Sequence, residues 1–84
     1  MVNVKTIVVG KTLPAARDLA DKLGVLNGSF VTSPRSIKAG GARGFSRVEL
    51  VLIDEAVRTD VLKAALAPTL MATGGQMYSV SRIL

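Results

Sequence analysis

The feature that most constrains this fold is the alternation of short apolar runs with segments of helical periodicity. Three runs rich in β-branched and other apolar residues occupy residues 5–9, 49–53 and 76–80. Apolar residues recur at helical spacing after the first run and again after the second. Such alternation implies parallel strands joined by right-handed crossovers, so the sequence predicts an α/β fold with about three parallel strands and two helices.

Capping residues set the expected limits of both helices. Thr12 is a candidate N-cap of the first helix, and Gly24 follows its end. Thr59 or Asp60 is the candidate N-cap of the second helix, and Pro68 is expected to bend or end it.

The segment between the first helix and the second strand predicts a small hairpin followed by a loop. The Asn27-Gly28 pair is a strong signal for a tight hairpin turn, with residues 29–33 as the second arm, which Pro34 ends. Residues 34–47 contain three glycines and no acid, and they predict a flexible basic loop. Four cations in this loop are candidate contacts for DNA or phosphate: Arg35, Lys38, Arg43 and Arg47. The alternative is a solvated loop in a generally basic chain.

Composition narrows the possible chemistry. The 84 residues form one domain at most. The chain has no cysteine and no histidine, which excludes disulfides, the usual zinc sites and histidine-based catalysis. Eleven Lys and Arg against six Asp and Glu give a formal charge of +5. No apolar run approaches the roughly 18 residues of a membrane-spanning helix, and the expected location is the cytoplasm.

The pair Asp54-Glu55 is the most informative motif for function. It follows the buried run 50–53, so both acids are expected at the carboxyl end of a strand, where open α/β sheets bind their ligands. In nucleotide-driven motors, the first such carboxylate lies in the Mg²⁺ shell and the second orients the attacking water. The alternative is an acid pair that caps a turn after a buried strand.

A second motif, Gly10-Lys11-Thr12, is similar to the end of a phosphate-binding loop. That loop requires a glycine five residues before Gly10, but Lys5 occupies this position. A three-residue connection between a strand and a helix cannot wrap a phosphate with successive amides. We therefore interpret the motif as an ordinary strand-to-helix turn.

Several short pieces, taken in order, resemble the ATPase domain of phage terminase large subunits, a P-loop NTPase of the RecA/ASCE type. The pieces are residues 27–29, 43–46, 50–56, 67–70, 74–75 and 79–81. The resemblance implies a small three-layer fragment of such a parallel sheet. It also implies that Asp54 is the Mg²⁺-associated carboxylate, Glu55 the catalytic glutamate, and Ser81 the start of the motif that couples nucleotide state to DNA movement.

The same resemblance suggests cofactors and partners. The family uses ATP and Mg²⁺, but the 84 residues contain no complete phosphate-binding loop. We therefore expect no ATPase activity and no tightly bound metal in the isolated chain, where Asp54 and Glu55 hold a hydrated Mg²⁺ weakly at most. The expected partners are further copies of the chain or a larger terminase or ATPase, in the cytoplasm of the host cell if a phage encodes it. Two alternatives remain: a small phage protein that modulates a larger ATPase, and a basic DNA-binding module.

Overall fold

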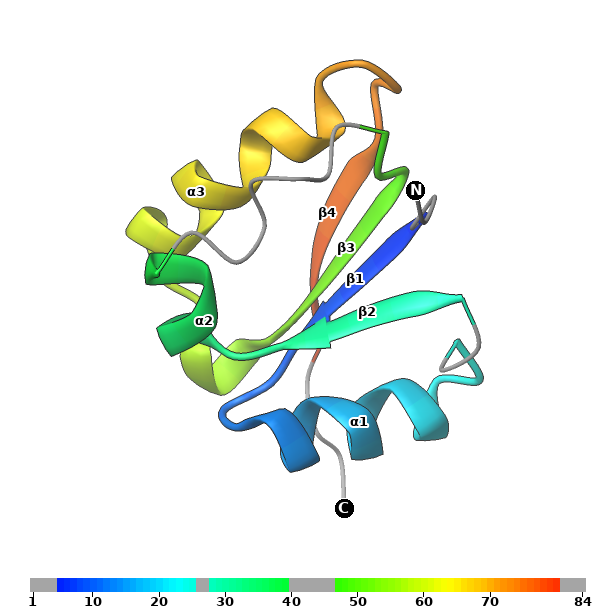
Figure 1. The fold of residues 1–84 in the computed structure, drawn as a ribbon, viewed down its shortest axis with the longest axis vertical. Helices are drawn as coiled ribbons and strands as arrows, with labels where there is room; N and C mark the ends of the chain where they lie inside the picture. Colours follow the sequence, from blue (N-terminus) through cyan, green and yellow to red (C-terminus); the bar gives the residue numbers. More distant parts are fainter. Residues whose placement is uncertain (1–4, 26–27, 40–46, 81–84) are drawn as a thin grey trace.

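The computed structural model describes residues 5–25, 28–39 and 47–80, and its core is a single parallel sheet (Figure 1). The four strands are β1 (Thr6–Val9), β2 (Ser29–Thr32), β3 (Leu50–Asp54) and β4 (Gln76–Val80). They lie in the order β2-β1-β3-β4, and every neighbouring pair is parallel. The predicted α/β class is confirmed, with one parallel strand more than expected.

Helices cover both faces of this sheet, because side chains alternate between the faces along each strand. Helix α1 (Leu13–Lys22) buries Leu19 and Ala20 with Val8 on one face. Helices α2 (Pro34–Lys38) and α3 (Asp60–Leu70) lie on the other face. That face holds the larger apolar cluster: Ile7, Val9, Ile37, Val48, Val51, Ile53, Leu62, Leu66 and Leu70.

Side-chain caps begin the two longer helices as the sequence predicts. The hydroxyl of Thr12 accepts a hydrogen bond from the Ala15 amide at 3.3 Å, and that of Thr59 accepts from the Leu62 amide at 3.1 Å. Pro68 was expected to bend or end α3; it does not end the helix, which continues to Leu70.

The predicted hairpin at Asn27-Gly28 is wrong. Strand β2 pairs with β1 in parallel, and α1 forms the crossover between them. The residues expected to form the first arm instead close α1: Gly24 has φ +73°, and the Val25 amide donates to the Ala20 carbonyl at 3.0 Å. Gly28 does adopt the positive φ that the pattern requires, +82°, but it leads into a parallel strand. Asn27 lies outside the described residues.

The predicted loop 34–47 is also only partly correct. Its first five residues form α2, because Pro34 suits the first turn of a helix and Ile37 is buried against the α3 face of the sheet. Residues 40–46 lie outside the described residues. Val48 is fully buried just before β3, and its amide donates to the Thr69 carbonyl at 3.0 Å. The ends of this segment are therefore part of the core.

Candidate functional site

The strand order places a topological switch point between β1 and β3. The connection from β1 leads through α1 to β2 on one side, whereas β3 lies on the other side of β1. In open parallel sheets, ligands bind outside the carboxyl ends of the strands at such a point. Two segments meet there: residues 10–12 after β1, and Asp54 with Glu55 at the end of β3. The acid pair therefore lies at the carboxyl end of a central strand, as predicted.

The carboxylate of Asp54 is held in a fixed position. Asp54 ends β3 and is only 5% exposed, and its Oδ1 accepts a hydrogen bond from the Ala56 amide at 3.1 Å. This bond caps the 3₁₀ turn of residues Glu55–Val57 (η1). The turn-capping alternative is thus an observed role of Asp54. A carboxylate has two oxygens, each able to accept more than one bond.

Glu55 differs from Asp54 in its access to solvent. It is the first residue of η1 and is exposed, so its carboxylate is available to a ligand at this edge. The two acids therefore combine one anchored and one accessible carboxylate. Within the described residues, no group of three or more acidic side chains is close enough to hold a metal ion.

The turn after β1 contributes one exposed cation, Lys11, and several amides around it already have partners. The Gly10 amide donates to the Thr32 carbonyl at 3.1 Å, and the Ala16 amide donates to the Thr12 carbonyl at 2.9 Å. The Ala15 amide is bound to the Thr12 hydroxyl, and Pro14 has no N–H. Three amides in and after the turn are therefore committed to β2 and to the start of α1.

Arg58 and Ser79 form a polar contact beside the acid pair that sequence patterns did not reveal. Nη1 of Arg58 donates to Oγ of Ser79 at 3.0 Å, linking the end of η1 to β4. The residues are 21 positions apart, and only the pairing of β3 with β4 brings them together. Ser81, the predicted coupling residue, lies outside the described residues.

Of the four cations predicted to contact DNA, the three that the structure describes do not gather in one patch. Arg35 and Lys38 are exposed on α2, which begins at the carboxyl end of β2. Arg47 is exposed near the start of β3. Because the strands are parallel, it lies at the amino ends of the strands, opposite to the carboxyl ends where α2 begins. Arg43 lies outside the described residues. Contact of these side chains with DNA stays a prediction.

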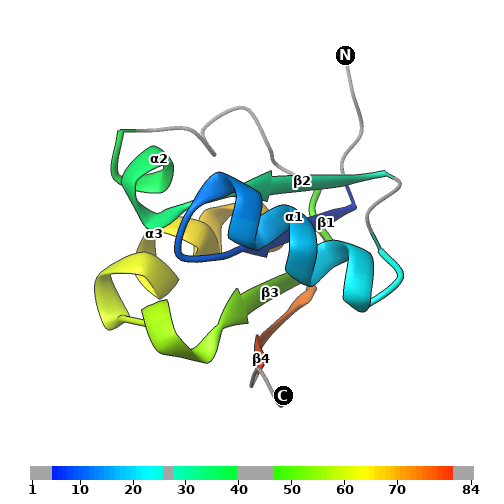
Figure 2. The ribbon, with the colours of Figure 1, turned by 90° about the horizontal axis from the view of Figure 1, so that it is seen from below.

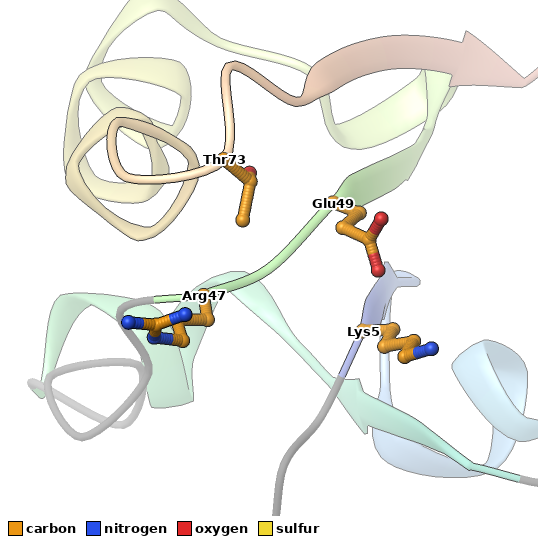
Figure 3. Close-up of a pocket in the computed structure, with 4 residues that line it drawn as sticks. All are labelled: Lys5, Arg47, Glu49 and Thr73. Carbon is orange, nitrogen blue, oxygen red and sulfur yellow. The ribbon is translucent and has the colours of Figure 1, made fainter.

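Arg47 instead lines a pocket at the amino edge of the sheet, with Lys5, Glu49 and Thr73 (Figure 3). The pocket has a volume of about 260 Å³. The Thr73 hydroxyl donates to the Val48 carbonyl at 2.6 Å, so it has no proton left to donate to a ligand. The Lys5 and Arg47 side chains point away from one another (Figure 3), so these cations do not converge on a common ligand.

Comparison of the chain with family models, curated proteins and solved structures found no match. Within the part of the chain that the structure describes, no helix has the length and apolar character needed to span a bilayer.

Proposed function

We propose that the chain is a terminase-type ATPase-like module, related to the motor that packages viral DNA, and that it does not hydrolyse ATP by itself. The observation that carries this proposal is the position of Asp54 and Glu55 at the carboxyl end of β3, beside the switch point between β1 and β3. This is the edge at which parallel α/β sheets bind nucleotides and other phosphates.

In this proposal the residues of the edge have distinct roles. The carboxylate of Asp54 would accept hydrogen bonds from the water shell of a Mg²⁺ ion, and Glu55 would accept a hydrogen bond from a water molecule. The exposed ammonium of Lys11, on the neighbouring connection, attracts the phosphates. When bound, Mg²⁺ neutralises charge on the phosphates. Two adjacent carboxylates supply too few ligands for an octahedral cage, so the chain alone holds the ion weakly.

The short turn after β1 is the reason that we expect no ATP hydrolysis by the chain alone. Phosphoryl transfer depends on positioning the phosphates, which motor ATPases achieve with successive backbone amides of a glycine-rich loop. Here the connection from β1 to α1 is only three residues long, which is too short to wrap a phosphate with successive amides, and the amides of Gly10, Ala15 and Ala16 already have partners. A second chain that carries a phosphate-binding loop would supply what these residues do not.

The positions of the described cations favour this proposal over a basic DNA-binding module. Arg35 and Arg47 lie at opposite edges of the sheet, separated by at least the length of a strand, about 15 Å at 3.3 Å per residue. A continuous DNA-binding face requires cations that follow the phosphate backbone together.

The first prediction concerns ATP hydrolysis by the chain alone. We expect phosphate release with Mg²⁺ and ATP to match the background without protein, with or without double-stranded DNA. Glu55→Gln should leave this result unchanged, and so should Glu49→Gln, which removes the same charge at the opposite edge. Turnover by the native chain that is lost in Glu55→Gln and retained in Glu49→Gln would contradict the proposal.

A further inference from the structure

Strand β4 presents an open edge to its surroundings. It ends the strand order and pairs with β3 alone, and within the described residues nothing lies beyond it (Figure 2). The Gln76 amide donates to the Glu49 carbonyl at 3.1 Å, so Gln76 directs its backbone groups toward β3. Backbone groups alternate in direction along a strand, and Met77 and Ser79 therefore direct theirs toward the open edge.

Strand β4 itself lacks the features by which proteins usually prevent strand pairing, although the Arg58 guanidinium contacts Oγ of Ser79. Charged residues, prolines and bulges are the common protections of an edge strand. The five residues Gln76–Val80 include no charge and no proline, although the chain as a whole carries +5. Strand β2, at the other edge of the sheet, is more protected, because each of its residues is buried or half-buried.

An exposed aromatic side chain lies at the centre of β4. Tyr78 is 52% exposed and lies in register with Val8 and Leu52, on the face that α1 covers only in part. Helix α1 packs against β1 and β2. Leu52 and Val80, also on this face, are only partly buried. The phenol ring therefore stands on an apolar strip next to the open edge.

We propose that β4 pairs antiparallel with β4 of a second copy of the chain, about a two-fold axis through Tyr78. In this register Met77 faces Ser79 of the other copy, and both residues direct their backbone groups toward the shared edge. Two such pairs, one on each side of the axis, form four backbone hydrogen bonds. The two Tyr78 side chains face one another as the central non-hydrogen-bonded pair, in which side chains approach most closely.

A second copy suits this edge better than an unrelated strand. A two-fold interface uses the same residues on both sides, and the five residues of β4 bring no like charges together when they pair with themselves. This inference does not depend on the proposed function. The resemblance places a phosphate-loop strand beside the same edge, so such a strand and a second copy would compete for it.

The interface is small, and the dimer is correspondingly weak. Pairing of five residues on each side buries less than the roughly 1,200 Å² of a stable interface. We expect a dissociation constant on the order of 100 µM.

Sedimentation equilibrium at protein concentrations below and above the expected dissociation constant tests the proposal. The native chain should pass from monomer to dimer, and Tyr78→Lys should weaken the dimer at least about tenfold, because it places two like charges opposite one another. Met71→Lys is the matched control: it adds the same charge at a side chain that is 80% exposed and lies outside β4. This control should dimerise like the native chain.

Two further measurements keep the test decisive if Tyr78→Lys fails to fold. Ser79→Pro removes an amide that faces the open edge and should also abolish the dimer, whereas Ser79→Ala, which removes only the hydroxyl that accepts from Arg58, should dimerise like the native chain. Amide exchange at Met77 and Ser79 of the native chain should slow as concentration rises. A native chain that stays monomeric, equal weakening by Tyr78→Lys and Met71→Lys, or slowed exchange confined to another element would overturn the proposal.

Discussion

Replacement of Leu66 by alanine should lower the free energy of unfolding by about 2–5 kcal/mol. Leu66 lies on α3 and has no exposed surface, and it belongs to the larger apolar cluster, between α3 and the sheet. Its truncation removes buried methyl groups and leaves a cavity that the surrounding side chains can fill only in part. For a chain of this length, with a total stability of about 4–13 kcal/mol, such a loss approaches unfolding.

Leu13→Ala is the matched control, because it makes the same chemical change at a side chain that is 53% exposed. We expect it to change the free energy of unfolding by less than about 0.5 kcal/mol. Urea denaturation followed by circular dichroism measures both variants. Equal losses would mean that α3 does not cover the sheet as described.

Gly10→Ala should destabilise the fold by about 1–3 kcal/mol and disturb the start of α1. A Cβ atom at residue 10 would lie 2.5 Å from the backbone nitrogen of Ala16 and 2.6 Å from its Cα. Both contacts are with the backbone, so relief requires α1 to move away from the end of β1. We expect urea denaturation to show the loss, and amide chemical shifts to change along the first turn of α1.

Gly28→Ala separates this steric effect from a conformational one. Gly28 has φ +82°, but no atom lies within 4 Å of the Cβ that a substitution would add. Its cost is the left-handed backbone strain of about 1–2 kcal/mol, without displacement of α1. If Gly10→Ala left the chemical shifts of α1 unchanged, this result would contradict the close approach of Gly10 to α1.

The strands and longer helices were predictable because their signals are local. Residues 7–9 and 50–53 show the continuous apolar pattern of buried parallel strands, and Thr12 and Thr59 cap helices through bonds within one turn. The hairpin prediction failed because Asn27-Gly28 indicates positive φ without specifying which strands pair. Residues 20–25 were already required to end α1. Strand β2 therefore pairs with β1. This pairing joins residues that are far apart in the sequence, so the residues next to Asn27-Gly28 do not indicate it.

The candidate site was predictable only in part, for the same reason. A buried run followed by two acids placed Asp54 and Glu55 at the end of a strand from the sequence alone. The turn after β1 lies close to Asp54 and Glu55 only because β1 lies beside β3 in the sheet, and the sequence does not show this strand order. The bond between Arg58 and Ser79 depends on the pairing of β3 with β4. Such long-range relations arise when the sheet assembles.

The most direct test of the account is to locate nucleotide binding on the chain by ¹⁵N–¹H NMR titration with Mg²⁺-ATP. The account predicts weak, Mg²⁺-dependent shifts at the carboxyl edge, at the amides of Lys11, Thr12 and Glu55. These shifts should disappear in Asp54→Asn, which keeps an Oδ1 to accept the bond from the Ala56 amide, and persist in Glu49→Gln. Shifts confined to the amino-edge residues Lys5 and Glu49, the absence of any shift, or an unchanged response in Asp54→Asn would contradict it.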